Sequence, residues 1–411
     1  MAKPRVIPVK SLMILVIWSM ACSVMLRSLC AQSSPEKGAV AIVPPVLRLA
    51  PLSQASESPV VTALAIDPQG AFAAAAGDDH AIRLFSLNDI NSRFPESSLL
   101  GGHRDWVQAI EFSWDGKLLA SCAKDGRLQV WKRLPGADMS SASVHTESSL
   151  GAWQQLWSIE VPHALLCLKF VGKESLLVGG FDASIYRLDL ASLQWTVDHR
   201  SESADVRSLV VNESKTRVAF AGRDGVVRIK PLNGRGQMAN EAGFAIAAHN
   251  HRVRAMCFSQ DDSMLYSVGE DRRLVGIELK SQSVQYQNDL GAGRLMAIER
   301  LPDDRYAVSG SDNTIRIVKP HTMATFSAPL EDPQVAWVPE PERLVGIKLI
   351  GHDGTIAVLR ASRDHLFSGS FDTTIRSWDI ASVLAGADAQ GRFIHPVSAQ
   401  YEDSSARERI R

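Results

Sequence analysis

The sequence has no excess of charge of one sign. Its 411 residues contain 44 Lys and Arg side chains against 45 Asp and Glu, which gives a formal net charge of −1. Proteins that bind nucleic acid electrostatically normally carry a basic excess. The near balance therefore argues against a nucleic-acid partner. Apolar residues make up 45% of the chain and charged residues 22%, so the protein is globular and neither disordered nor fibrous.

Cysteine is scarce, and its placement does not suit disulfides. Of five cysteines, only Cys122, Cys167 and Cys257 lie beyond residue 31. Each of them stands within an apolar run, and no pair has the spacing of a metal site. An odd number of cysteines in strand-like contexts predicts buried thiols, not a disulfide framework.

The N-terminal apolar stretch is short for a membrane helix. Residues 12–26 carry no charge over 15 positions, whereas a bilayer-spanning helix needs about 20 residues. Small residues follow this stretch, and three basic residues precede it: Lys3, Arg5 and Lys10. This layout is typical of a secretory signal peptide. We therefore expect residues 1–31 to be a cleaved signal peptide or an uncleaved signal anchor through residues 12–29, with a buried core helix as the remaining alternative.

The basic residues ahead of the apolar stretch also bear on localisation. They favour an N-terminus that stays inside while the body is translocated outward. We expect an exported protein, periplasmic or extracellular, that touches a membrane only through an uncleaved N-terminal segment.

The rest of the chain shows a repeat and no helical periodicity. Seven aspartates recur at intervals of 41 to 60 residues, each in a turn that precedes a short alternating apolar run. They are Asp79, Asp125, Asp182, Asp224, Asp271, Asp312 and Asp372. Short alternating runs between Asp and Gly turns are typical of antiparallel strands joined as a meander.

Small antiparallel sheets of this kind cannot bury their faces alone, so they must pack radially into a closed ring. We predict an all-β fold, a seven-bladed β-propeller of four-stranded antiparallel blades, over residues 44–385. Residues 32–43 are expected to be a linker and residues 386–411 a flexible tail. Two insertions have no assigned role: a Ser-rich loop at 135–153, and a segment at 319–343 that either docks a partner or covers a blade edge.

These repeats resemble the WD-repeat β-propeller family. Three histidine–aspartate pairs have the family's spacing and two tryptophans stand at its terminal position: His103–Asp125, His249–Asp271 and His352–Asp372, with Trp131 and Trp378. The other blades lack this histidine. The resemblance implies that these residues are structural, with the aspartate bonded to the imidazole and the imidazole linked to a hydroxyl and the tryptophan. It also implies that a strand near residues 45–49 completes the last blade and closes the ring.

Motifs for catalysis are missing from the sequence. There is no nucleophile elbow, phosphate loop or zinc-protease motif, so we expect no enzyme activity and no cofactor. His249 and His251 could bind a metal from one strand, but His249 belongs to the repeat, which leaves His251 alone and predicts no metal. The alternative is an envelope enzyme or accessory subunit that uses the central channel. It would require acids or histidines converging there.

Function in such a ring is expected in the turns, because the strands are occupied by packing. Two turns of each blade reach one face: the turn before the innermost strand and the turn with the recurring aspartate. Their basic and aromatic residues are the predicted binding residues: Trp106, Lys124, Arg207, Arg223, Arg252, Arg254, Arg294 and Phe371. Arginine and aromatic residues are enriched at interface hot spots, and the guanidinium fork suits carboxylate or phosphate groups.

We predict a monomeric, non-catalytic scaffold that binds protein partners, with acidic segments as candidate ligands. The arginines are expected to gather on the blades of Asp224 and Asp271, and the aromatic residues elsewhere on the rim. The alternative is that the arginines are solvated or pair with Asp205, Glu270 and Asp271.

Overall fold

The computed structural model describes nine stretches of the chain: residues 44–53, 57–87, 97–134, 153–173, 175–200, 205–239, 243–291, 293–320 and 347–385. Several predicted segments lie outside the described residues: the signal or anchor at 1–31, the linker at 32–43, the tail at 386–411 and almost all of the insertions at 135–153 and 319–343.

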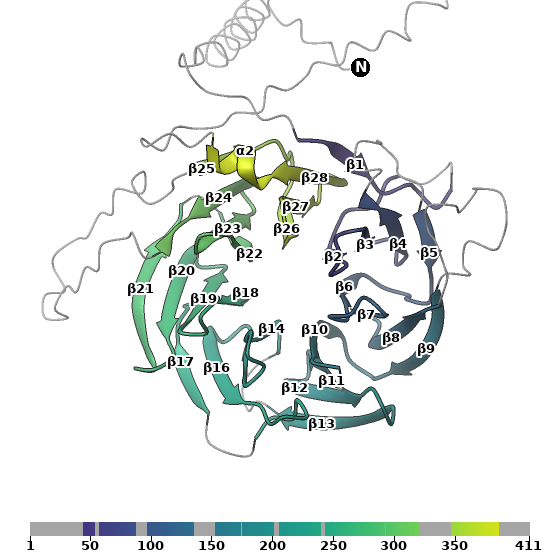
Figure 1. Ribbon diagram of the computed structural model, residues 1–411, viewed down its shortest axis with the longest axis horizontal. Helices are drawn as coiled ribbons and strands as arrows, with labels where there is room; N and C mark the ends of the chain where they lie inside the picture. The colour runs from purple at the N-terminus through teal and green to yellow at the C-terminus, as the bar shows by residue number, and fades with distance from the viewer. Residues whose placement is uncertain are drawn as a thin grey trace, which may run out of the picture. The chain divides into compact units, whose positions relative to one another are not determined.

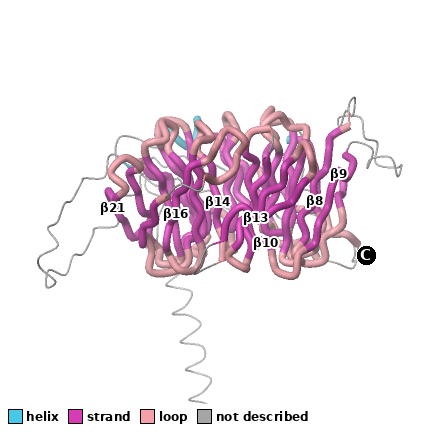
Figure 2. The backbone as a smooth tube through the Cα atoms, turned by 90° about the horizontal axis from the view of Figure 1, so that it is seen from below, coloured by secondary structure: helices cyan, strands magenta, loops and turns pink. Residues whose placement is uncertain are grey.

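The described residues form 28 strands in seven sheets, each of four antiparallel strands (Figure 1). The innermost strands contact one another around a closed circle. The predicted seven-bladed propeller is therefore confirmed. Figure 2 shows the strands running between two rims of turns. One short helix, α2 (Ile380–Ala385), follows the last strand.

The first four blades run from the inner to the outer strand as follows. They are β2 (Ala63–Ile66), β3 (Phe72–Ala76), β4 (Ile82–Ser86) and β5 (Ser97–Leu100); β6 (Val107–Phe112), β7 (Leu118–Ala123), β8 (Arg127–Arg133) and β9 (Trp153–Glu160); β10 (Leu165–Val171), β11 (Ser175–Gly180), β12 (Ser184–Asp189) and β13 (Gln194–Arg200); and β14 (Ser208–Val211), β15 (Arg217–Ala221), β16 (Val226–Pro231) and β17 (Phe244–Ala247).

The remaining three blades follow the same order. They are β18 (Val253–Phe258), β19 (Met264–Gly269), β20 (Arg273–Glu278) and β21 (Ser283–Asp289); β22 (Leu295–Leu301), β23 (Arg305–Gly310), β24 (Thr314–Val318) and β25 (Ile347–Ile350); and β26 (Ile356–Ala361), β27 (His365–Ser370), β28 (Thr374–Asp379) and β1 (Val46–Arg48).

The ring is closed by the first strand. β1 pairs antiparallel with β28, with Leu47 opposite Ile375, so the start of the described chain completes the seventh blade as the sequence predicts (Figure 1). Leu47 is fully buried. Closure leaves no open end of the ring at which an unpaired blade could template aggregation.

The core lies between neighbouring blades. One cluster of buried side chains joins Ala74 and Ile82 of the first blade to Ile110 and Trp131 of the second. Because each apolar layer is shared by two blades, no blade buries its faces without its neighbours.

The recurring aspartates shape one turn in every blade. The residue directly after each aspartate has a positive φ, from 62° at Asn313 to 76° at Gly126. The carboxylate fixes the turn by accepting a backbone N–H two residues on, as Asp125 does from Arg127 at 2.8 Å. This is the local hydrogen bonding for which Asp is favoured in turns.

Candidate partner-binding site at the channel mouth

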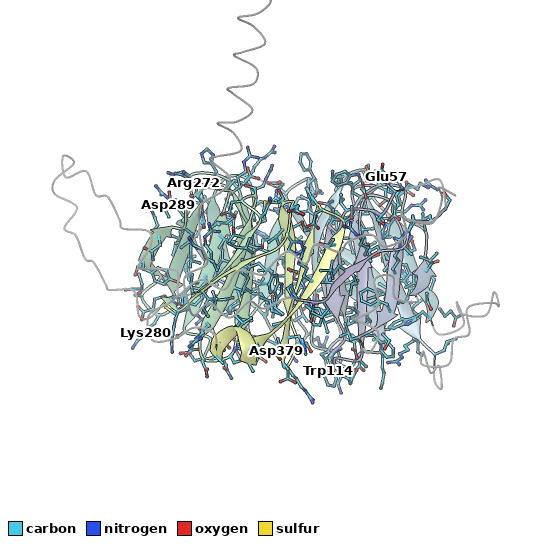
Figure 3. All side chains as sticks on the ribbon, turned by 90° about the horizontal axis from the view of Figure 1, so that it is seen from above. Glu57, Trp114, Arg272, Lys280, Asp289 and Asp379 are labelled. Atoms are coloured by element: carbon cyan, nitrogen blue, oxygen red, sulfur yellow. The ribbon has the colours of Figure 1, made fainter. Side chains whose placement is uncertain are left out.

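The two kinds of turn that the sequence singles out lie on one face of the ring, which we call the aspartate face. Figure 3 places Glu57, Arg272 and Asp289 on this face. The turns between the first and second strands of each blade lie on the opposite face, where Figure 3 shows Trp114.

The most complete histidine network lies in the blade that closes the ring. His352 Nδ1 lies 2.9 Å from Asp372 Oδ2, and Ser368 Oγ lies 2.8 Å from His352 Nε2. Trp378 Nε1 donates to the same Ser368 Oγ at 2.9 Å. His352 is 4% exposed and Trp378 1%. These side chains are engaged inside the blade and are not presented to a partner.

Burial and hydrogen bonding together set the protonation of His352 and Asp372. Burial lowers the pKa of His352 below its ordinary value, even though Asp372 favours the charged imidazole. Burial alone would raise the pKa of Asp372, but the hydrogen bond and charge of His352, together with hydrogen bonds from Thr374 and the backbone N–H of Asp353, hold that pKa well below the ordinary value. A neutral imidazole can donate from Nδ1 to Asp372 and accept at Nε2 from the Ser368 hydroxyl, so it makes both hydrogen bonds.

Lowering the pH is expected to destabilise the protein through His352. Its folded pKa lies below the unfolded value, so between the two values the unfolded chain binds more protons and stability falls as the pH drops below about 6.5. Urea unfolding at pH 7.5 and pH 5.5 measures this slope. We expect His352→Gln to reduce the slope, and His365→Gln, at an exposed histidine of the same blade, to leave it unchanged. Equal slopes in all three proteins would contradict the prediction.

The other two histidines make similar contacts. His103 Nδ1 lies 3.3 Å from Asp125 Oδ2, with Ser121 Oγ 2.6 Å from Nε2. His249 Nδ1 lies 2.9 Å from Asp271, and Ser267 Oγ lies 2.8 Å from its Nε2. Trp131 is 4% exposed.

The four blades without this histidine use a different partner, which the sequence reasoning missed. In each of them the residue four positions after the aspartate contacts its carboxylate: Arg83 with Asp79, Tyr186 with Asp182, Arg228 with Asp224, and Arg316 with Asp312. In the blade of Asp182, His163 also contacts the Tyr186 hydroxyl at 2.9 Å. In three of these four blades, a basic residue four positions after the aspartate was a signal in the sequence.

A cavity of about 470 Å³ opens where the aspartate face meets the channel. All seven blades line it, which places it on the ring axis. We call it the mouth cavity. Its lining residues are Thr62, Trp106, Gln108, Lys124, Ala164, Leu166, Phe181, Asp205, Arg207, Arg252, Arg254, Met296, Ala357 and Phe371.

The mouth cavity brings together six of the eight predicted binding residues: Trp106, Lys124, Arg207, Arg252, Arg254 and Phe371. Arg223 and Arg294 are exposed and do not line it. Trp106 and Phe371 stand on other blades than the arginines, but they line the same cavity. The blades taper to a narrow axis, so turns from blades far apart in the sequence meet at the centre.

The aromatic side chains at the mouth remain accessible. The rings of Trp106 and Phe371, from the second and seventh blades, are 6.5 Å apart in an edge-to-face arrangement. Phe371 is 40% exposed and Phe181 is 48% exposed. Lys124 Nζ lies 4.3 Å from the centre of the Trp106 ring, and the Arg223 guanidinium lies 5.4 Å from that of Phe181. Accessible aromatic rings beside cations are typical of a binding surface.

Two acids neutralise part of the positive charge at the mouth. Arg252 lies 3.7 Å from Asp205 and 3.6 Å from Glu270, and Arg254 lies 3.3 Å from Glu270. Arg223 Nε also lies 4.0 Å from Asp205 Oδ1. The alternative that the arginines pair with nearby acids therefore holds for Arg223, Arg252 and Arg254.

Arg207 differs from its neighbours. Its Nη1 donates to Leu166 O at 2.9 Å and to Gln108 Oε1 at 3.2 Å, and no ion pair forms between Arg207 and a carboxylate of the described residues. Burial lowers the pKa of Arg207, and that of Arg254 to about 10, which leaves Arg254 charged at neutral pH. The mouth cavity thus keeps an excess of positive charge.

A second cavity of about 490 Å³ continues along the channel, and we call it the lower channel. The two cavities share lining residues, which include Gln108, Arg207, Arg254 and Met296. We call this shared level of the channel the waist.

Three glutamates of the lower channel are each engaged. Glu111 accepts from Lys169 Nζ and from Phe170 N. Arg300 lies 3.2 Å from Glu213. Glu299 accepts Ala361 N at 3.0 Å, and burial raises its pKa.

The structure confirms two of the three predicted buried thiols and corrects the third. Cys122 and Cys167 are buried, but Cys257 is only partly buried because its strand, β18, lines the lower channel. None of the three forms a disulfide. Burial raises the pKa of Cys167 and of Cys257 to about 12, so these thiols are not reactive thiolates at neutral pH.

One protein-family model matches four segments of the chain. The model of the WD domain, G-beta repeat, matches residues 50–86, 95–132, 243–275 and 339–379. These matches cover blades that carry the histidine as well as the first blade, which lacks it.

Three relatives match over different lengths. Ribosome biogenesis protein ytm1 of Schizosaccharomyces pombe is 25% identical over 72% of this chain and 69% of its own length. Target of rapamycin complex subunit wat1 of the same organism is 40% identical, over only 20% of this chain and 24% of its own. A WD repeat-containing protein 91 homolog of Dictyostelium discoideum is 22% identical over 78% of this chain and 38% of its own.

These comparisons contradict the predicted localisation. The first two relatives are named for ribosome biogenesis and for the target of rapamycin complex, neither of which is an exported or envelope assembly. The expectation of an exported or membrane-anchored protein was therefore wrong. Within the described stretches, no helix is long and apolar enough to cross a membrane. A short apolar run behind basic residues is only a compositional pattern, and it does not by itself distinguish a signal peptide from other N-terminal segments.

Proposed function

We propose that this chain, which is a WD-repeat β-propeller, is a non-catalytic scaffold that binds an acidic segment of a partner protein at the mouth cavity. The observation that carries the proposal is the convergence of exposed aromatic rings and incompletely neutralised cations on one cavity lined by every blade. Such residues supply most of the binding energy at protein interfaces.

The balance of charge supports an acidic ligand. Lys124, Arg207, Arg252 and Arg254 line the mouth cavity, whereas Asp205 is its one acidic lining residue. The side chain of Asp205 is only 2% exposed and is already paired with Arg252. Incoming carboxylates would therefore meet a positive potential, which favours association and orients the partner.

A partner protein is also consistent with the relatives. One of them is named as a subunit of a complex. We extend only this general role to the present chain, since that relative matches 20% of it. We expect the ring to act as a monomer and to bind no nucleic acid.

The second candidate, an enzyme or accessory subunit that uses the channel, gains no support from the geometry. The glutamates of the lower channel bond to basic side chains or backbone N–H groups of other blades. The histidines His103, His249 and His352 bond within their blades. These groups are already engaged and are not arranged around a shared substrate position.

Site-specific photo-crosslinking tests the proposal with a matched pair of positions. Phe181 on the aspartate face and Trp114 on the opposite face are 48% and 47% exposed. A benzoylphenylalanine at Phe181 is expected to crosslink one partner in the native host, through an acidic segment identified by mass spectrometry. The same group at Trp114 should not capture it. Capture of that partner from Trp114 alone, or through a segment that is not acidic, would reject the proposal.

A further inference from the structure

We propose that the waist of the channel, at Arg207, binds the carboxylate of one glutamate or aspartate side chain of the partner, while an apolar neighbour in the same segment packs on Trp106 and Phe371. This inference rests on the proposed function and specifies the chemistry of the ligand.

Arg207 occupies the one level of the channel that both cavities share. It precedes β14 directly, is partly buried, and lines the mouth cavity as well as the lower channel. The only hydrogen bonds of its side chain to described residues use Nη1 and two neutral oxygens, Leu166 O and Gln108 Oε1. The remaining donors of the guanidinium fork are therefore available to a ligand that enters from the mouth.

The two most buried arginines of the described residues, Arg83 and Arg316, are compensated within the fold. Arg83 lies 2.6 Å from Asp79, and Arg316 pairs with Asp312 in the same way. Arg254, beside Arg207 at the waist, lies 3.3 Å from Glu270. A partly desolvated cation without a carboxylate is costly for the free protein, and an incoming carboxylate would offset that cost. Arginine binds carboxylates with two parallel hydrogen bonds.

The charge along the channel favours an acid over a basic side chain at this position. Above the waist lie Lys124 and Arg252, and beside it lies Arg254. Below it, Lys169 and Arg300 are already paired with Glu111 and Glu213. A lysine or arginine inserted from the mouth would approach Arg207 and Arg254 before it reached any carboxylate that is not already paired.

The aromatic pair above the waist specifies the neighbouring residue. Trp106 and Phe371 form an edge-to-face pair, and Phe371 is 40% exposed. An apolar side chain that covers these rings would bury surface that the free ring leaves in water. The mouth cavity of about 470 Å³ has the size of a small-ligand pocket, so it accepts one or two side chains and not a folded element.

Two capped dipeptides test the inference on the intact protein. N-acetyl-Glu-Phe-amide carries the predicted pair of side chains, and N-acetyl-Gln-Phe-amide differs from it only by the charge. Isothermal titration is expected to give at least tenfold tighter binding of the Glu probe. In Arg207→Gln the two probes should bind within twofold of each other. Lys215→Gln removes one positive charge from an exposed residue of the opposite face and should keep the tenfold preference.

An NMR measurement on the unmodified protein covers the case in which Arg207→Gln does not fold. The side-chain Nε–H signal of Arg207 should shift on addition of the Glu probe and stay in place with the Gln probe. Equal affinity of wild type for both probes, or a preference that survives in Arg207→Gln, overturns the inference. If Phe181 still captures an acidic partner under that result, the proposed function stands and only the placement of the carboxylate at Arg207 fails.

Discussion

Exchanging both Lys124 and Arg223 for glutamate is expected to weaken binding of the partner captured through Phe181 by at least about 100-fold. Lys124 lies over Trp106, and Arg223 lies over Phe181. The double variant replaces two cations by two anions beside Trp106 and Phe181, two aromatic residues that line the mouth cavity. Complementary charge becomes repulsion, which reduces the association rate and destabilises the complex. Titration calorimetry with the purified partner measures the loss.

The design separates binding from folding. Both side chains are exposed, with that of Arg223 at 54%, so the double variant should stay folded. Its melting temperature should fall slightly, because the pair of Arg223 Nε with Asp205 Oδ1 at 4.0 Å is lost. Lys173 and Lys215, which flank Trp114 on the opposite face, provide the control with the same change of charge. Their double exchange for glutamate should alter the affinity by less than threefold. An equal loss from both variants would mean that total charge, and not the mouth, governs binding.

The salt dependence of the affinity tests the same variant in a second way. Screening reaches about 8 Å at physiological ionic strength, so the wild-type affinity should fall as salt is added. The variant has lost the attraction and should gain affinity or remain unchanged over the same range. A wild-type affinity that does not depend on salt would argue that aromatic contacts alone hold the partner.

The fold was predictable because each blade repeats the same short turn. An aspartate followed by a residue of positive φ makes the same turn whether that residue is Gly126, Arg272 or Thr373. The turn depends on residues that are neighbours in the sequence, so the sequence reveals it even in the blades that lack the histidine. The closing strand was predictable only from the resemblance to the WD-repeat family, which implies that a strand near residues 45–49 completes the last blade.

The site was predictable only in part. Turn positions identified the face and the kinds of residue, since these follow from the repeat. The meeting of Trp106 with Phe371 depends on the radius of the closed ring, and no local pattern carries that information. Nor could the sequence show that Glu270 neutralises Arg254 while Arg207 has no carboxylate partner among the described residues. The arginines four positions after Asp79, Asp224 and Asp312 were visible in the sequence. Arg376 stands at the same spacing after Asp372, whose carboxylate contacts His352, so the spacing alone does not identify the partner of the aspartate.

The largest loss of stability is expected from Asp79→Ala in the first blade. Arg83 is 1% exposed, and its Nη2 and Nη1 lie 2.6 and 3.2 Å from the two carboxylate oxygens of Asp79. Removing the carboxylate leaves a buried guanidinium without its counter-charge, which costs about 3–5 kcal/mol of unfolding free energy. Urea unfolding followed by circular dichroism measures the change.

Two further variants show whether the buried charge is the cause. In the double variant Asp79→Ala/Arg83→Leu no charge remains to be desolvated, so part of the loss should be recovered. Glu213→Ala breaks an ion pair with Arg300 whose side chains are 69% and 31% exposed, and should cost no more than about 1 kcal/mol. If Asp79→Ala costs as little as Glu213→Ala, the pair does not stabilise the blade.

The position of Arg83 also predicts where the weakened protein opens. Its Nε donates to Ala50 O at 2.8 Å, and Ala50 closely follows β1, the strand that completes the seventh blade. Arg83 therefore connects the first blade to the segment that closes the ring, and Asp79 holds its side chain in place. In Asp79→Ala, amide exchange should accelerate in Val46–Arg48 more than in Val226–Pro231 on the far side of the ring (Figure 1). Uniform acceleration would indicate that the pair stabilises its own blade without a specific role in closure.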